Sequence, residues 1–216
     1  MNNPLRIFRD LGDRLGEAWT LIDLSQAQYR IGDYPGAIRA TEEALRICQN
    51  LGEPRGEGSA LIRLGSARLI RGDYAGAVRD AEQALQISQD LGDRQEEAEA
   101  LMVLARARRG TGDYPGAVRD AEQALRNFQD LGDREEEAGT LNELARVRRE
   151  TGDYPGAVRD AEQALRIFQD LGEPPGEAEA LNEAGTLYRV RGSPDQAEAC
   201  HRQALAIARK LAAPGI

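Results

Sequence analysis

The sequence predicts an all-α fold, a solenoid of antiparallel helix pairs. Three observations support this class. Two short phrases recur every 40 residues, helix start and stop signals occur twice in each 40-residue unit, and no segment shows the alternation of a strand. The phrases are Gly-Asp-Tyr at residues 32, 72, 112 and 152, and Leu-Gly followed by Asp or Glu at residues 11, 51, 91, 131 and 171.

The repeats divide the chain into six segments. Residues 4–13 match residues 164–173 at most positions, so the chain opens on the tail of a second-type helix. We therefore expect a tail helix over 1–12 and one solenoid domain over 13–216, with helix pairs at 13–50, 51–90, 91–130, 131–170 and 171–216. The last helix has no predicted successor to cover it, so we expect a longer array or self-association through the terminal helices.

The unit at 91–130 shows how each pair is specified. Asp93 is a suitable N-cap, and Glu96 stands three residues later at the capping-box spacing. Gly112 suits a left-handed C-cap. Asp113 then caps the second helix, and Pro115 lies in its first turn, where a missing N–H costs nothing. The signals predict helices of about 17 residues joined by tight turns.

The charge pattern bears on which partners the chain can bind. The net charge of the 216 residues is −9, spread along the chain without blocks of one sign, which argues against nucleic acid. Acids and arginines alternate, and this predicts exposed i,i+4 pairs such as Glu122–Arg126 and Glu162–Arg166. Arginine is abundant and Lys210 is the one lysine, a composition that suggests a GC-rich bacterial genome.

Neither an enzyme nor a metal or cofactor site is expected. His201 is the single histidine, stands where other units carry Thr or Ala, and has no cysteine cluster beside it. No nucleophile–base motif or phosphate-binding loop occurs. Cys48 and Cys200 lie almost four units apart and are expected to be free thiols. No membrane span or signal peptide is evident, so we expect a cytoplasmic protein.

The repeated positions resemble the tetratricopeptide repeat. The matching run in the second unit is Leu61, Leu64-Gly65, Gly72-Asp73-Tyr74, Ala77 and Ala84-Leu85. The unit has 40 residues where the common form has 34, and Gln replaces the usual closing Pro. This longer form resembles kinesin light chains, Leu-Gly-Asn-type adaptors and the C-terminal repeats of actinobacterial nucleotide-binding transcriptional regulators. The resemblance implies a right-handed superhelix whose first helices line a concave groove.

Differences between the copies indicate which face carries specificity. Units 91–130 and 131–170 differ at 8 of 40 positions, and seven of the eight lie in the first helix or just before it. Five of these, at 99, 102, 103, 107 and 110, share one broad helical face. Apart from position 107, this is the face that the resemblance places in the groove.

The groove face predicts an apolar, aromatic first half and an arginine-rich second half. This chemistry suits a peptide with an apolar anchor and nearby carboxylates. Two alternatives remain open: a solvated face, with Arg146 paired to Glu143 and Glu150 on its own helix, and Trp19 covered by the tail helix. The predicted groove residues are Trp19, Ile22, Gln26, Tyr29, Ile62, Arg63, Leu69, Met102, Arg106, Arg109, Asn142, Arg146, Arg149, Asn182 and Arg189.

The function predicted from the sequence is non-catalytic binding of a protein or peptide. The context we expect is a sensor or interaction arm of a cytoplasmic bacterial regulator, acting in signalling or transcription. A head-to-tail self-assembly module and a small-ligand sensor are the alternatives.

Overall fold

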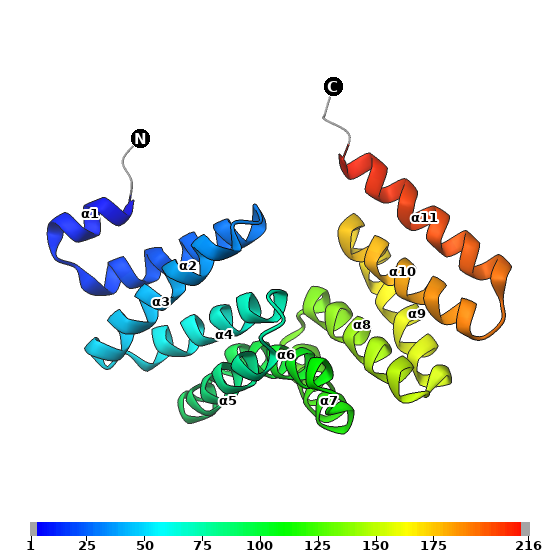
Figure 1. Ribbon diagram of the computed structural model, residues 1–216, viewed down its shortest axis with the longest axis horizontal. Coiled ribbons are helices and arrows are strands. Elements are labelled where there is room, and N and C mark those ends of the chain that lie inside the picture. The colour runs from blue at the N-terminus through cyan, green and yellow to red at the C-terminus, as the bar shows by residue number, and fades with distance from the viewer. Residues whose placement is uncertain (1–3, 213–216) are drawn as a thin grey trace. The chain divides into compact units, whose positions relative to one another are not determined.

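The computed structural model of the chain describes residues 4–212, and every regular element in that range is an α-helix (Figure 1). The predicted all-α helical-repeat class is confirmed. The predicted first and last segments also include residues 1–3 and 213–216, which lie outside the described residues. The helices are α1 Pro4–Leu11, α2 Arg14–Arg30, α3 Tyr34–Leu51, α4 Pro54–Ile70, α5 Tyr74–Leu91, α6 Arg94–Thr111, α7 Tyr114–Leu131, α8 Arg134–Thr151, α9 Tyr154–Leu171, α10 Pro174–Val190 and α11 Pro194–Ala212.

The helices begin where the capping residues predict. The Asp93 carboxylate accepts a hydrogen bond from the Glu96 backbone N–H at 3.2 Å, and Asp113 accepts one from Gly116 at 3.1 Å. Two helices start differently: Pro54 and Pro174 occupy the first helical position, and the Glu before each makes no side-chain cap bond. From α2 on, the helices are 17–19 residues long, as predicted.

A left-handed glycine ends most helices. Gly112 has φ 84° after α6, and its N–H donates to the Arg109 carbonyl at 3.1 Å. A side chain at this φ would bring Cβ against the carbonyl oxygen, so glycine is required for the tight turn. The turn returns the chain at once, so the second helix can pack on the first.

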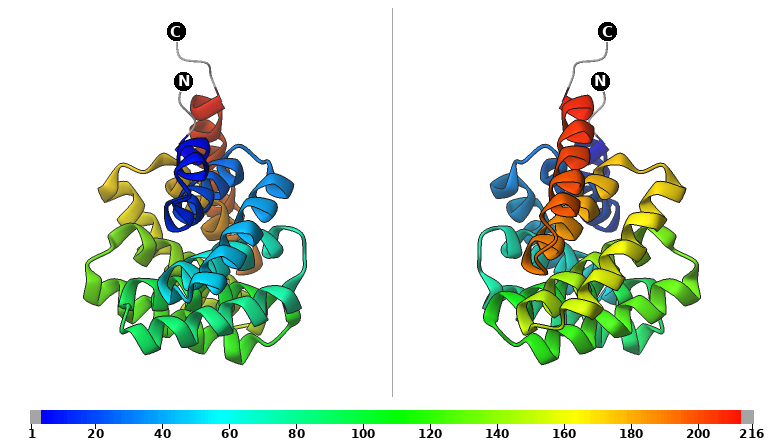
Figure 2. Two further views of the ribbon diagram at one scale, coloured as in Figure 1. Left: turned by 90° about the vertical axis from the view of Figure 1, so that its left-hand side faces the viewer. Right: turned by 90° about the vertical axis from the view of Figure 1, so that its right-hand side faces the viewer.

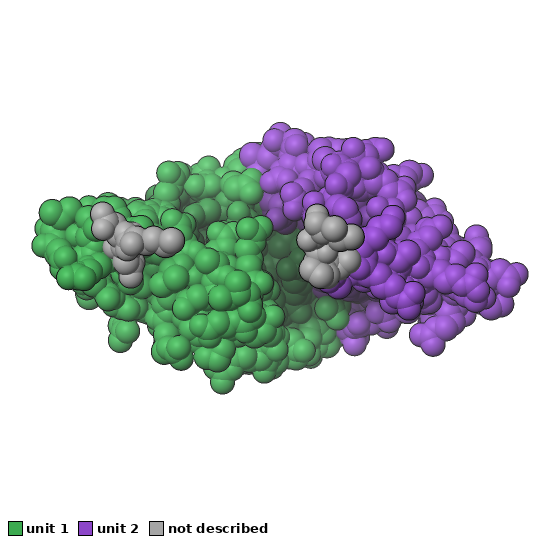
Figure 3. Space-filling model, turned by 90° about the horizontal axis from the view of Figure 1, so that it is seen from above, with its two compact units in different colours: residues 1–112 green, residues 113–216 purple. Residues whose placement is uncertain are grey.

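The chain forms two compact units, residues 1–112 and 113–216, coloured separately in Figure 3. Unit 1 contains α1–α6 and unit 2 contains α7–α11. Within each unit, helices that follow one another pack side by side, such as α2 with α3 and α10 with α11 (Figure 2). First helices of successive pairs also touch: α2 with α4 and α4 with α6 in unit 1, and α8 with α10 in unit 2.

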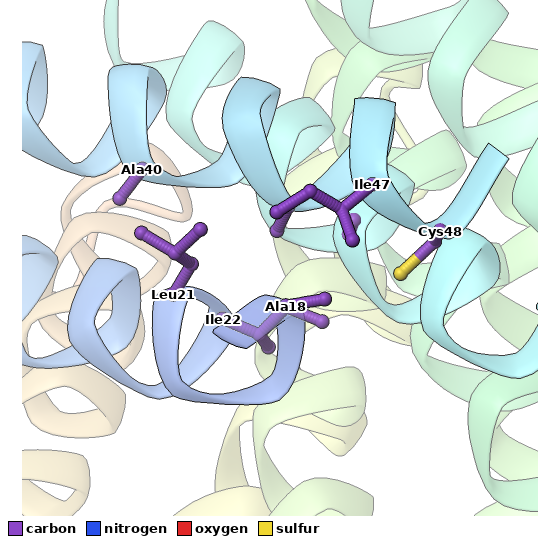
Figure 4. Packing of buried hydrophobic residues seen from close by; sticks show 8 residues of the cluster. Ala18, Leu21, Ile22, Ala40, Ile47 and Cys48 are labelled. Carbon is purple, nitrogen blue, oxygen red and sulfur yellow. The ribbon is translucent and has the colours of Figure 1, made fainter. Parts of the chain in front are cut away.

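The core of unit 1 is built from small and branched apolar side chains. In Figure 4, Ala18 and Leu21 of α2 face Ala40 and Ile47 of α3. Ala18 is fully buried and Ile47 is 2% exposed. Alanine lets the helices approach closely, and the branched side chains fill the remaining space.

Unit 2 has equivalent packing with an aromatic filler. Ile167 and Phe168 of α9 pack with Leu141 of α8 and Ala180 of α10. The Phe168 ring occupies the space that a side chain on Gly176 would need. Within each unit the core therefore runs from one helix pair into the next, as expected for a repeat that cannot bury its apolar faces alone.

The predicted i,i+4 pairs Glu122–Arg126 and Glu162–Arg166 are wrong. Glu122 instead accepts from Arg148 of the next first helix at 2.8 Å, and Glu162 accepts from the Tyr188 hydroxyl at 2.6 Å. Arg148 and Tyr188 are half-buried between helices, so they approach these carboxylates more closely than the exposed arginines do. The pairs therefore join one repeat to the next within unit 2.

Both cysteines are free thiols, as predicted. Cys48 is buried, and burial raises the pKa of its thiol, so it is a packing residue rather than a nucleophile. Across residues 4–212 no helix combines the length and apolarity that a membrane crossing needs.

Candidate functional site

The candidate binding surface lies on the first helices of the pairs, α2, α4 and α6 in unit 1 and α8 and α10 in unit 2, which we call the inner helices. Their mutual contacts form a continuous row within each unit. The fifteen predicted groove residues all stand on these helices. Their burial and partners separate them into core, hollow and ion-pair groups.

Three predicted groove residues lie in the core. Ile22, Ile62 and Met102 are 6%, 2% and 4% exposed, because neighbouring inner helices pack against one another along this edge. Trp19 and Leu69 are half-buried and pack against the core clusters of unit 1. The apolar part of the predicted face is therefore mainly helix packing, and we leave these residues out of the proposed surface.

Unit 1 contains a hollow of about 250 Å³ between α2, α3, α4 and α6. Four predicted groove residues line it: Gln26, Tyr29, Arg63 and Arg106. We call it the arginine hollow, because three arginines and no carboxylate line it. The lining residues are Ser25, Gln26, Tyr29, Arg30, Ala37, Thr41, Arg63, Ser66, Ala67 and Arg106.

The donors of the arginine hollow come from its long side chains. The three short hydroxyl groups of the lining each donate to a carbonyl of their own helix, Ser25 to Ile22 at 2.7 Å, Thr41 to Ala37 at 2.8 Å and Ser66 to Ile62 at 3.0 Å. Their hydrogens are thus engaged, and the guanidinium, amide and phenol groups supply the remaining N–H and O–H donors. The lining suits a ligand rich in acceptor oxygens.

The aromatic wall of the hollow is held in place by a second ring. Tyr29 packs edge-to-face on Tyr34, with ring centroids 5.6 Å apart, and remains 39% exposed. Arg63 reaches Glu99 of α6 at 3.6 Å, a long contact for an ion pair. A ligand carboxylate could therefore compete with Glu99 for this guanidinium.

The arginines of unit 2 are paired within the protein. Arg149 donates to Glu183 of α10 at 2.7 Å, and Arg146 bonds Glu179 and approaches Glu183 at 3.8 Å. We call these α8–α10 pairs the rungs. Burial alone would lower the pKa of Arg146, but Glu179, Glu143 and Glu183 outweigh it and leave the pKa raised. The rungs neutralise this part of the predicted basic face.

Two asparagines occupy equivalent positions in unit 2. Asn142 is 2% exposed, and neither atom of its amide has a hydrogen-bond partner within residues 4–212. Asn182, 40 residues later, is exposed, and its Oδ1 lies 3.4 Å from His201 Nδ1. An unpaired buried amide costs about 1–3 kcal/mol, so Asn142 calls for an explanation.

Arg189 and Arg109 are the remaining predicted groove residues. Arg189 of α10 is exposed and makes no ion pair with a described residue, and Arg109 of α6 is half-buried. No group of three His, Cys, Asp or Glu side chains suited to a metal ion occurs between residues 4 and 212.

Sequence reasoning missed the part of the hollow contributed by Arg30, Thr41 and Ser66. A signal for Thr41 was available, because other units carry Ala81, Ala121 or His201 at that position. The two compared units, 91–130 and 131–170, both carry Ala at this position, so their differences did not indicate it.

A family model described as Tetratricopeptide repeat matches residues 57–130 and 136–210, more than half of the chain. No curated protein sequence matches the chain significantly. Several solved structures share the fold, and the match extends to proteins of different size.

A putative kinesin light chain of Podospora anserina with nearly identical repeats is 22% identical, with a TM-score of 0.67 over 99% of this chain and 100% of that one. A Rap protein complexed with Competence and Sporulation Factor is 14% identical, with a TM-score of 0.81 over 91% and 54%. A signal transduction ATPase of Pyrococcus horikoshii with a tetratricopeptide repeat sensor is 16% identical, with a TM-score of 0.68 over 93% and 34%. At these identities the likenesses show the fold alone.

Proposed function

Because the chain belongs to the tetratricopeptide repeat family, we propose that it is a non-catalytic scaffold that binds an acidic segment of a protein or peptide on its inner helices. The arginine hollow carries this proposal. Arg30, Arg63 and Arg106 line one cavity without a carboxylate, in a chain whose net charge is −9. Guanidinium groups gathered at one cavity suit a ligand that bears a carboxylate.

The size of the hollow favours a side chain over a whole small molecule. Its volume of about 250 Å³ lies below the roughly 300–1,000 Å³ of sites that enclose a drug-sized ligand. One Asp, Glu or aromatic side chain, or a terminal carboxylate, would fill it, and the rest of a peptide would extend across α2, α4 and α6. Tyr29 offers a ring for stacking, and Gln26 an amide for a backbone group.

Unit 2 supports the proposal through Asn142 and Asn182. A side-chain amide offers one acceptor and two donors, and these complement the N–H and C=O of an extended peptide. Binding would satisfy the unpaired Asn142 amide, although side chains covering it must first move, since it is 2% exposed. The Arg–Glu rungs of α8 and α10 fix the helices that carry the two amides.

The comparison proteins are consistent with this proposal but do not establish it. One of the similar structures is a Rap protein in complex with a named factor, and another carries its repeats as a sensor within a signal transduction ATPase. We infer the same general context here, a sensor or interaction arm of a cytoplasmic bacterial regulator that acts in signalling or transcription.

A peptide-display selection on the whole chain tests the proposal. We expect enrichment of sequences with Asp or Glu, and we expect Arg30→Ala with Arg63→Ala to weaken binding of a selected peptide at least about tenfold, since 1.4 kcal/mol corresponds to tenfold. Arg46→Ala is the matched control, because Arg46 is an exposed arginine of α3 outside the hollow. Enrichment without acidic residues, or equal loss in the control, would refute the proposal.

A thermal-shift screen with small dicarboxylates tests the small-ligand alternative. A ligand at 100 times its dissociation constant adds about 2.7 kcal/mol of stability. A shift with a dicarboxylate that disappears in the Arg30→Ala, Arg63→Ala variant, together with no peptide enrichment, would assign the hollow to a small metabolite.

A further inference from the structure

A side-chain bond recurs wherever the end of a second helix packs on the next first helix. At each such junction a Gln amide near the end of one helix donates to a Glu in the first turn of the next. The pairs are Gln49–Glu57 at 3.1 Å, Gln89–Glu97 at 3.5 Å, Gln129–Glu137 at 3.1 Å and Gln169–Glu177 at 3.1 Å.

Helix α1 makes the same junction with α2, using arginine. Arg9 Nε donates to Glu17 Oε1 at 2.7 Å, and Arg9 Nη2 donates to Glu43 Oε1 at 2.7 Å. The Phe8 ring lies over Gly16, 2.5 Å from where a Cβ would stand. Yet α1 has eight residues and none of them is buried, so the helix is held mainly by Arg9, Phe8 and the half-buried Leu5.

The end of α11 repeats the pattern of α1, and no helix among residues 4–212 receives it. Leu205, Ile207, Arg209 and Leu211 stand 200 residues after Leu5, Ile7, Arg9 and Leu11. Leu205 is 50% and Leu211 54% exposed, and Arg209 makes no ion pair or hydrogen bond with a described residue. In the right-hand view of Figure 2, no other described helix of unit 2 covers the outer side of α11.

We propose that this face of α11 docks on α2 of a second copy of the chain and displaces that copy's α1. Leu205 takes the place of Leu5, and Arg209 takes the place of Arg9 beside Glu17 and Glu43. The charges are complementary, because Glu17 is 1% exposed and is paired with Arg14 of its own helix and with Arg9, whose place Arg209 would take. The contact is heterologous, so repeated docking builds head-to-tail assemblies. This inference does not rest on the peptide-binding proposal.

One position of α11 is a poor match, and it supplies the sharpest test. Ala208 stands where α1 has Phe8, so docked α11 leaves the space over Gly16 unfilled. Ala208→Phe restores the ring, and burial of its apolar surface should lower the dissociation constant for self-association about tenfold or more. Ala206→Phe is the matched control: both alanines are exposed, but position 206 corresponds to arginines or Gln in the other units.

Sedimentation velocity of the whole chain over a concentration series measures the association. We expect Ala208→Phe to associate at lower concentration than wild type. Arg209→Glu should associate only at higher concentration, and Arg202→Glu, which changes an exposed charge on the same helix, should behave as wild type. Unchanged helical circular dichroism establishes that each variant is folded. A monomeric Ala208→Phe variant at every soluble concentration, or equal association of Ala206→Phe, would overturn the proposal.

Hydrogen exchange distinguishes displacement of α1 from simple stacking. If α11 takes the place of α1, the backbone amides of residues 4–11 should exchange faster as Ala208→Phe assembles, because their helix loses its support. Association that leaves the exchange of residues 4–11 unchanged would refute the displacement.

Discussion

Asp80 of α5 gives unit 1 a specific pH dependence, which Asp80→Asn should remove. The carboxylate is 8% exposed; Oδ1 accepts from Arg68 Nη1 at 2.8 Å, and Oδ2 has no hydrogen-bond partner. Burial raises the pKa of Asp80 from 3.8 to about 6, and the attraction of Arg68 only partly offsets it. Between about pH 4 and about pH 6, Asp80 of the folded protein therefore holds a proton that the unfolded chain has released.

The direction and size of the effect follow from these two pKa values. Below pH 3.8 the carboxyl is protonated in both states, and its contribution to folding is fully present. As pH rises through about 6 the buried group ionises, and that contribution is lost. A difference of about two pKa units at 1.36 kcal/mol each corresponds to about 3 kcal/mol. Asn resembles the neutral acid, so the variant escapes the loss.

Urea unfolding followed by circular dichroism measures the effect. The free energy of unfolding of Asp80→Asn, minus that of wild type, should rise by about 3 kcal/mol between about pH 4 and about pH 7.5. Asp23→Asn is the control, because Asp23 is an exposed carboxylate of α2 in the same unit. A difference that stays constant over this range would refute the reasoning, because burial would then not govern the titration.

Three further predictions concern single contacts. Gly139→Ala should raise the free energy of unfolding by about 0.5–1 kcal/mol, because Gly139 is in mid-helix and nothing lies within 4 Å of the new Cβ. Gly152→Ala should lower the free energy of unfolding by about 1 kcal/mol in the same urea assay, because Gly152 has φ 86°. Tyr188→Phe should cost about 1 kcal/mol and remove a phenol whose pKa, raised to about 12 by the bond to a carboxylate, is visible by ultraviolet titration. Tyr29→Arg with Arg63→Glu should abolish acidic-peptide binding in fluorescence polarisation while the unfolding midpoint is kept or raised; retained binding would contradict a role for the hollow.

Local structure was predictable because its causes are local. Asp93 and Gly112 mark the start and end of α6 through bonds to residues three or four positions away, so the sequence contains the whole interaction. The 40-residue period then assigned the same roles to every other unit. Pro54 and Pro174 mark the first positions of α4 and α10 by an equally local rule.

The open surface was harder to predict, because variation between copies also marks packing. Met102 and Val103 differ from Asn142 and Glu143, which suggested a partner-facing position, yet Met102 and Val103 are each 4% exposed. Adjacent inner helices touch along this edge, and the side chains there adapt to one another. The 40-residue period alone does not reveal this contact, because the contact depends on how far one inner helix is shifted along the next.

The same shift explains why only part of the arginine pairing was predictable from the sequence. Arg146 contacts Glu143 of its own helix at 3.6 Å, as the alternative from the sequence predicted. It also bonds Glu179, 33 residues away, and Arg149 bonds Glu183, 34 residues away. A spacing of 33 or 34 residues joins neighbouring inner helices of a 40-residue repeat. With that offset known, the rungs of unit 2 could have been found by counting.

The rungs also explain why a hollow exists in unit 1. Moving back 120 residues, Arg146 and Arg149 become Gln26 and Tyr29, and their acceptors Glu179 and Glu183 become Ser59 and Arg63. No ion pair joins the described residues of α2 and α4, and these helices border the cavity instead. Both rung arginines and both rung acids are thus replaced here, and Arg63, which stands at the position of an acid, lines the cavity. A ligand carboxylate bound to Arg63 would supply an ion pair at a junction that has none between α2 and α4, which is the physical reason to expect an acidic partner at this place.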